Sequence, residues 1–125
     1  MKTPLYNNDV VEGYMLDGII VASFKVKIFD LDAAKIAVKE RIDACKGESY
    51  PLLVDARDVS SITKEARDYF ASPEGTVLIS ASALVLDSVL NRFLGNFFLQ
   101  INKPKVPLRL FTNIEDAVKW LQQFK

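Results

Sequence analysis

The densest run of chemically capable side chains in this sequence lies between residues 55 and 68. The residues there that could bind a protein partner or a ligand are Arg57, Asp58, Ser60, Ser61, Thr63, Lys64 and Arg67. A helix that begins near Thr63 would offer free backbone N–H groups to an anion, and Lys64 would add positive charge. We therefore expect a partner-binding or ligand-binding surface in this segment.

A solvated loop is the simpler interpretation of the same segment. Ser61 or Thr63 would cap the helix that follows, and Arg57 would pair with a neighbouring acid. Such an ion pair contributes little to stability when it is exposed. The sequence leaves the solvated loop and the binding surface as open alternatives.

Other groupings of charged residues give no site. Asp55 and Asp58 are three residues apart in an expected loop, which supports neither glycoside hydrolysis nor magnesium binding. Glu115 and Asp116 fall in the first turn of an expected helix, where acids stabilise the helix dipole. The sequence also has no Gly-x-Gly, and hence no glycine-rich loop for a phosphate.

The residue types that are missing exclude most catalytic chemistry. The chain has no histidine, which removes histidine bases, nucleophiles and metal ligands. It has one cysteine, Cys45, so neither an intrachain disulfide nor a thiolate zinc site can form within the chain. Cys45 lies on an apolar helical stripe, which is typical of a buried hydrophobe rather than a reactive thiol. We expect no catalytic residue, no metal and no cofactor.

Charge and hydropathy restrict the partners. The 16 basic and 16 acidic residues give a formal net charge of zero, unlike the basic surplus of nucleic-acid-binding and membrane-surface proteins. Residues 1–9 lack the apolar stretch of a signal peptide, and no apolar run reaches the roughly 18 residues of a membrane span. These features predict a cytoplasmic protein that binds no nucleic acid and has no transmembrane segment.

The elements that position these groups begin with a hairpin and a helix. The chain of 125 residues, 50% of them hydrophobic, is expected to form one domain over residues 1–125. The pair Asp17-Gly18 supplies the positive φ angles of a type I′ turn and predicts an N-terminal β-hairpin. A helix should follow from its cap Asp30 to a stop at Gly47. The apolar stripe of this helix is formed by Leu31, Ala34, Val38, Ile42 and Cys45.

The rest of the chain is expected to alternate strands and helices. In order, these are a strand over 51–55, a helix from Thr63 to Phe70, a break over 72–75, a strand over 82–86, a helix from Asp87 or Ser88 to Ile101, a strand over 106–111 and a last helix to Phe124. For residues 76–80 we predict a short helical segment, with one longer strand as the alternative. Thr112 and Glu115 have the spacing of a capping box for the last helix.

This order predicts an α/β fold with a mixed β-sheet, in which an N-terminal β-hairpin is followed by alternating helices and strands. Strands that alternate with helices pair in parallel through right-handed crossovers. Ligands favour the carboxyl ends of such strands. Here those ends are the residues after Asp55, Leu86 and Phe111.

The helix expected over residues 88–101 has apolar residues on more than one side. Either the sheet and a neighbouring helix cover it, or a second subunit does. Phe93 and Phe97 would form the dimer interface, the alternative being that they belong to the core. We expect a homodimer, and we expect Trp120 to anchor the last helix on the sheet or at its margin.

Several stretches of the sequence resemble the STAS family, the fold of the bacterial anti-sigma-factor antagonists. They are residues 52–63 (LLVDARDVSSIT), 63–69 (TKEARDY) and 94–104 (LGNFFLQINKP), and the order of elements agrees. The chain is most similar to an uncharacterised bacterial branch of SpoIIAA-like proteins. The resemblance covers nearly the whole chain and implies a STAS/SpoIIAA-like sheet.

The resemblance implies a non-enzymatic regulatory domain. Antagonists of this family bind a kinase through the loop after the third strand and the next helix, and phosphorylation of a serine in an Asp-Ser-Ser/Thr-Gly motif releases the kinase. With Val59 and Ile62 on the apolar positions of that motif, Thr63 takes the place of the aspartate. Lys64 then takes the place of the phosphoserine, and Ala66 that of the glycine.

The usual phosphoserine is therefore missing, because a lysine cannot accept a phosphate in this way. Ser60, Ser61 and Thr63 remain as nearby hydroxyls. We expect a non-catalytic regulatory or protein-interaction domain with an unidentified protein partner. Some relatives of the fold hold small molecules or lipids, so a module that binds a small anion or a lipid is the alternative.

Overall fold

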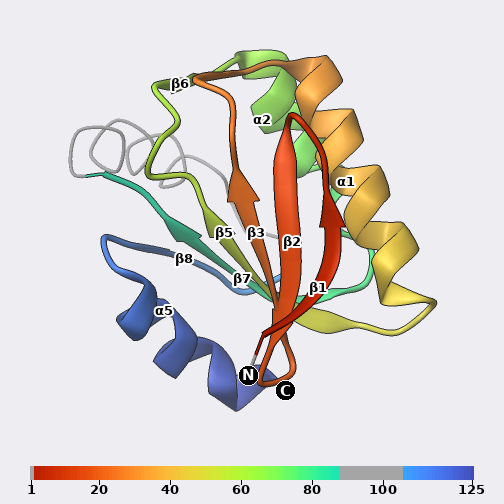
Figure 1. Cartoon of the computed structure of the whole chain (residues 1–125), viewed down its shortest axis with the longest axis vertical. Helices are drawn as coiled ribbons and strands as arrows, with labels where there is room; N and C mark the ends of the chain where they lie inside the picture. Colours follow the sequence, from red (N-terminus) through yellow and green to blue (C-terminus); the bar gives the residue numbers. More distant parts are fainter. Residues whose placement is uncertain (1, 88–105) are drawn as a thin grey trace.

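A computed structural model describes residues 2–87 and 106–125 of the chain (Figure 1). The strands are β1 (Lys2–Asn7), β2 (Val11–Leu16), β3 (Ile19–Phe24), β4 (Ile28–Phe29), β5 (Tyr50–Asp55), β6 (Ser61–Ile62), β7 (Ile79–Val85) and β8 (Leu108–Phe111). The helices are α1 (Leu31–Cys45), α2 (Lys64–Phe70), α3 (Pro73–Thr76), α5 (Ile114–Leu121) and the 3₁₀ turn η1 (Gln122–Phe124). None of these described helices is long and apolar enough to cross a membrane.

The helix predicted over residues 88–101 lies outside the described residues. Phe93 and Phe97 of the expected dimer interface belong to it. The homodimer therefore stays a prediction.

Six strands form one mixed sheet in the order β1-β2-β3-β5-β7-β8. Strands β1, β2 and β3 are antiparallel neighbours, whereas β3, β5, β7 and β8 run parallel. A second, two-stranded parallel sheet joins β4 to β6. The sheet has both antiparallel and parallel neighbours, which confirms the predicted α/β fold with a mixed sheet. Strands β3, β5, β7 and β8 are parallel because each crossover connection returns the chain to the same end of the sheet.

The predicted N-terminal hairpin is confirmed and is part of a longer antiparallel meander. Asp17 and Gly18 have φ angles of 49° and 79°, the positive values that a type I′ turn needs. The sequence pattern predicts no strand over residues 2–7, yet these residues form the edge strand β1. The first half of β1 is exposed and lacks apolar alternation, and its register with β2 shifts between Pro4 and Tyr6.

Helix α1 follows the prediction in its ends but not in its buried face. The Asp30 carboxylate accepts a hydrogen bond from the Ala33 backbone N–H at 2.9 Å and so caps the helix. The predicted stripe is wrong at Leu31 and Ile42, which are only half-buried. Arg41 is buried instead, because it finds backbone carbonyl partners inside the fold.

Replacing Lys46, at the end of α1, with glycine should make the folded chain more stable. Lys46 has a φ of 50°, the left-handed conformation that costs an L-residue about 1–2 kcal/mol. Lys46→Gly should raise the free energy of unfolding by about 0.5–1 kcal/mol, since glycine loses part of that gain to the entropy of the unfolded chain. Urea unfolding measures the change.

Lys35→Gly is the matched control, since Lys35 is exposed within α1. The same substitution there should lower the free energy of unfolding by about 1 kcal/mol. If Lys46→Gly lowered the free energy of unfolding as Lys35→Gly does, the left-handed conformation of Lys46 would be contradicted.

The segment between α2 and β7 differs from the prediction. A short helix is present, but it is α3, which begins at Pro73, three residues before the predicted segment over 76–80. Ser72 caps this helix, because its hydroxyl accepts a hydrogen bond from the Gly75 backbone N–H at 3.1 Å. Leu78, with a φ of 61°, then redirects the chain into β7, which begins at Ile79 rather than at residue 82. The predicted helical segment over 76–80 is therefore wrong, and the longer strand is closer to the structure.

The last helix begins one residue later than the predicted capping box. Asn113, not Thr112, is the cap: its side-chain oxygen accepts from the Asp116 backbone N–H at 2.9 Å, and its amide donates to the Asp116 carboxylate at 3.0 Å. This reciprocal pair replaces the expected Thr112–Glu115 pair. Trp120 contacts the rings of Phe111 and Phe124, which confirms its predicted role as an anchor of this helix.

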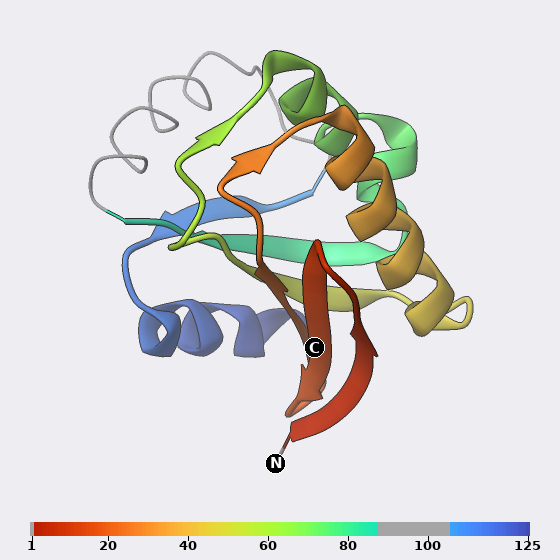
Figure 2. The same ribbon diagram turned by 45° about the horizontal axis from the view of Figure 1, so that its top comes forward.

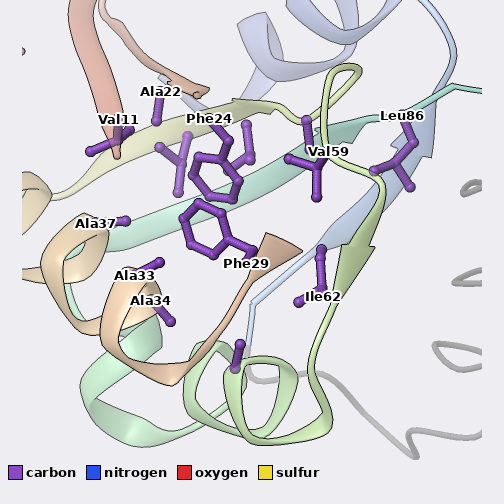
Figure 3. Packing of buried hydrophobic residues seen from close by; sticks show 14 of the residues in the cluster. Val11, Ala22, Phe24, Phe29, Ala33, Ala34, Ala37, Val59, Ile62 and Leu86 are labelled. Carbon is purple, nitrogen blue, oxygen red and sulfur yellow. The ribbon is translucent and has the colours of Figure 1, made fainter. Parts of the chain in front are cut away.

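The sheet divides the core into two layers (Figure 2). Helices α1, α2 and α3 lie over one face, and α5 lies over the other. Successive side chains alternate between the faces, so that on β3 Ile20 points to the α1 side and Val21 to the α5 side. On the α1 side, Phe24 and Phe29 stack with ring centroids 4.0 Å apart, between the sheet and α1 (Figure 3).

Candidate functional site

An apolar cavity lies between the sheet and the helices α1, α2 and α3. Its volume is about 330 Å³, at the lower end of the roughly 300–1,000 Å³ typical of small-molecule sites. Residues of β1, β3, β5, β6, β7, β8 and the three helices form its wall. The wall includes Tyr6, Val38, Arg41, Ser82, Leu84 and Leu108.

The described helices α1, α2 and α3 do not cover this face of the sheet evenly. On the central strands, Ala22 and Leu52 are buried. On β7 and β8, Ser82, Leu84 and Leu108 point to the same face but are only half-buried. Among the described residues, the apolar face is thus least covered at β7 and β8, where a ligand could bury more of it.

Arg41 brings a positive charge to the wall of the cavity. Its side chain is 3% exposed, and its guanidinium donates to the carbonyl oxygens of Val77 at 2.8 Å and Gly75 at 3.2 Å. Burial lowers the pKa of Arg41, but an arginine stays charged at neutral pH. These bonds tie α1 to the turn between α3 and β7, so Arg41 both closes the cavity and charges its wall.

Tyr6 reaches the same wall from the edge strand β1. Its partner in β2 is Gly13, where a Cβ would overlap the Tyr6 ring, so the missing side chain of Gly13 makes room for that ring. The Tyr6 hydroxyl is buried and has no hydrogen-bond partner among the described residues. Burial raises the pKa of Tyr6 to about 12, so the hydroxyl is a donor at neutral pH.

The raised pKa of Tyr6 predicts a loss of stability at alkaline pH. Below the ordinary pKa of 10.0, Tyr6 is protonated in both the folded and the unfolded chain. Between that value and about 12, only the unfolded chain ionises, so Tyr6 lowers the free energy of unfolding by about 1.4 kcal/mol per pH unit. Urea unfolding from about pH 9 to pH 12 should show this loss in the wild type and less of it in Tyr6→Phe. If the free energy of unfolding fell equally with pH in the two proteins, the burial of the hydroxyl would be contradicted.

The polar groups at the cavity suit binding rather than bond breaking. Tyr6 and Arg41 offer hydrogen-bond donors and positive charge, but neither is a base at neutral pH. Cys45 is buried, as predicted, and burial raises the pKa of its thiol, which keeps it protonated. Among the described residues, no group of three or more Cys, Asp or Glu side chains could hold a metal ion.

The residues predicted from the sequence lie mostly outside the cavity. Arg57 is exposed and pairs with Asp55 at 2.9 Å, which is the local ion pair of the loop interpretation. Asp58, Ser60 and Ser61 are exposed around the same turn. The Asp55 carboxylate is thus engaged by an arginine, which is not the geometry of a catalytic carboxylate pair.

The start of α2 offers no anion site. Thr63 caps it, since its hydroxyl accepts from the Ala66 backbone N–H at 3.2 Å. Lys64 is exposed and pairs with Asp68 at 2.9 Å. The predicted anion site depends on free backbone N–H groups and on the helix dipole. Helix α2 has only seven residues, and the Ala66 N–H is already bonded to Thr63, so α2 offers little attraction to an anion.

Arg67 is the one predicted residue that also lines the cavity. It is half-buried, and its guanidinium donates to the Ile62 carbonyl at 2.6 Å. Ile62 lines the cavity as well. The predicted segment therefore borders the cavity from β6 and α2. Thr63 caps α2, and the other predicted polar residues are exposed, namely Arg57, Asp58, Ser60, Ser61 and Lys64.

Sequence reasoning missed Tyr6 and Arg41. The one available signal for Tyr6 was Gly13, a glycine inside a strand pattern, which often marks a site where another group approaches closely. Arg41 gave no signal, because arginine is mostly exposed and only the fold shows which carbonyls lie beside it.

Comparisons with known proteins give a family for the sequence and a solved structure with a similar fold. The sequence model of the family described as Domain of unknown function (DUF7793) matches residues 14–125. A crystal structure of an uncharacterized protein of the DUF3478 family from Shewanella loihica PV-4, described as having a SpoIIAA-like fold, is similar with a TM-score of 0.64 and 12% identity. That match covers 97% of this chain and 95% of the other. No curated protein matches the sequence. The predicted SpoIIAA-like fold is confirmed.

Proposed function

We propose a binding function for this chain, which belongs to the DUF7793 family. In this proposal, the chain is a non-catalytic domain. It holds one small apolar molecule between its sheet and the helices α1, α2 and α3. The observation that carries the proposal is the apolar cavity of about 330 Å³. Protein interiors are close-packed, and voids larger than a water molecule are few. A space of this size, at a sheet face that the described helices only partly cover, supports a binding feature rather than a packing defect.

The size of the cavity limits the ligand. A water molecule takes up about 30 Å³ in the liquid, so 330 Å³ has room for roughly eleven groups of that size. Apolar cavities stay dry and take up apolar molecules, because water finds too few hydrogen-bond partners in them. A linear alcohol of ten carbons is thus a suitable probe.

Thermal unfolding with 1-decanol tests this proposal. A ligand that binds only the folded chain stabilises it by about 2.7 kcal/mol at a concentration of one hundred times its Kd. For a domain of this size, the midpoint of unfolding should then rise by roughly 5–15 °C. A midpoint that does not move with 1-decanol, or with a panel of shorter and longer alcohols, would argue against the cavity as a binding site.

A protein-interaction role is the second candidate, favoured by the surface between residues 57 and 64. Arg57, Asp58, Ser60, Ser61 and Lys64 are exposed along this segment. Ile62, between them, lines the cavity. A ligand that moves Ile62 would therefore change the surface that a regulatory partner contacts, without a phosphoserine.

A pull-down with a charge-reversed variant tests this second candidate. Arg57→Glu combined with Lys64→Glu alters the surface at two exposed side chains that do not line the cavity. Lys35→Glu combined with Lys119→Glu is the control, because both lysines are exposed elsewhere. A partner lost only by the first variant supports the interaction role, and equal recovery by both contradicts it.

A further inference from the structure

Arg41 places a positive charge at the cavity that the described part of the chain does not balance with a carboxylate. The side chain is 3% exposed, and its hydrogen bonds go to the neutral carbonyls of Gly75 and Val77. No Asp or Glu side chain of the described residues lies within 4.0 Å of its guanidinium. Buried charges in proteins are normally paired, because an unpaired charge is costly in an apolar environment. The site therefore favours an anion in the adjoining space.

Tyr6 adds an unused hydrogen-bond donor to the same wall. Its hydroxyl is buried without a partner among the described residues, although the great majority of buried polar groups have one. Arg41 is near enough to influence the ionisation of Tyr6. A ligand oxygen that reached both groups would satisfy the hydroxyl and neutralise the guanidinium together.

We propose that the cavity takes a molecule with an apolar body and one carboxylate, and that Arg41 and Tyr6 recognise the carboxylate. This inference rests on the proposed function and deepens it. The apolar wall at Val38, Leu84 and Leu108 receives the body of the ligand. The charge of Arg41 attracts the carboxylate, and the Tyr6 hydroxyl donates to it. A neutral ligand of the same length would leave the charge of Arg41 unbalanced.

Calorimetric titration with decanoate and with 1-decanol tests the proposal, because the two probes share their chain length and differ in the head group. The wild type should bind decanoate at least tenfold more tightly than 1-decanol, since a buried charge-assisted hydrogen bond contributes about that much. In Tyr6→Phe, the affinity for decanoate should fall more than the affinity for 1-decanol, so that this preference falls severalfold. Continued binding of 1-decanol by this variant would show that the cavity is still formed.

Tyr14→Phe is the matched control. Tyr14 packs on the α5 side of the sheet and does not line the cavity, so this variant should keep the wild-type preference. A wild-type preference below tenfold, or one that Tyr6→Phe leaves unchanged, would overturn the carboxylate proposal and leave the apolar binding function standing. Failure of both probes to bind would overturn the binding function as well.

Discussion

Replacing Ser82 with phenylalanine should abolish the binding of 1-decanol and leave the domain folded. Ser82 is half-buried on β7 and lines the cavity, so a phenyl ring there would occupy the space that the alcohol needs. Because the ring fills a cavity rather than a packed core, it should also stabilise the chain, by about 0.5–2 kcal/mol. The affinity, measured by calorimetry, should fall more than tenfold while the midpoint of thermal unfolding rises.

Ser49→Phe is the matched control for this variant. Ser49 is exposed in the turn before β5 and does not line the cavity, so the same change of residue there should leave the affinity at its wild-type value. If Ser82→Phe folds and still binds 1-decanol as the wild type does, the alcohol binds elsewhere. The cavity would then have no role in binding.

Replacing Arg41 with leucine should cause the largest loss of stability, about 2–4 kcal/mol. The substitution removes two hydrogen bonds from a buried guanidinium and leaves the Gly75 and Val77 carbonyls without that partner. It also releases α1 from the turn between α3 and β7. Urea unfolding gives the change in the free energy of unfolding. The urea concentration at the midpoint should fall, while the dependence of the free energy of unfolding on urea concentration stays the same.

Arg57→Leu separates this effect from the general loss of an arginine. Arg57 is exposed, and its ion pair with Asp55 should contribute no more than about 1 kcal/mol. If Arg41→Leu is as stable as Arg57→Leu, the bonds of Arg41 to the two carbonyls do not hold the fold together. Its place as a fixed charge at the cavity would then also be in question.

The features of the fold that sequence reasoning predicted depend on signals within a few residues of each other. The Asp17-Gly18 turn and the caps at Asp30 and Thr63 act on their own neighbours, so their effects can be read locally. Strand β1 and the small sheet of β4 and β6 depend on pairing with distant segments. Their short or polar sequences carry no periodic signal of that pairing.

The candidate site could not be predicted for the same reason. Tyr6 comes from β1, Arg41 from α1 and Ser82 from β7, and the cavity brings these distant segments together. Arg57 and Lys64 drew attention because their charges are close in sequence, yet each pairs with a nearby acid at the surface. Burial distinguishes Arg41 from the other cations of the described residues. It is a property of the folded chain and not of the local sequence.

The central claim is that one small apolar molecule binds in the cavity, and nuclear Overhauser effects from bound 1-decanol test it most directly. The methyl groups of Val38, Leu84 and Leu108 line the cavity, whereas those of Val21, Val85 and Leu121 lie on the α5 side of the sheet. We predict effects between the alkyl chain and the first set alone, at one alcohol per chain. The claim would be contradicted by effects to the second set alone. It would also be contradicted by effects to neither set when the protein is saturated with the alcohol.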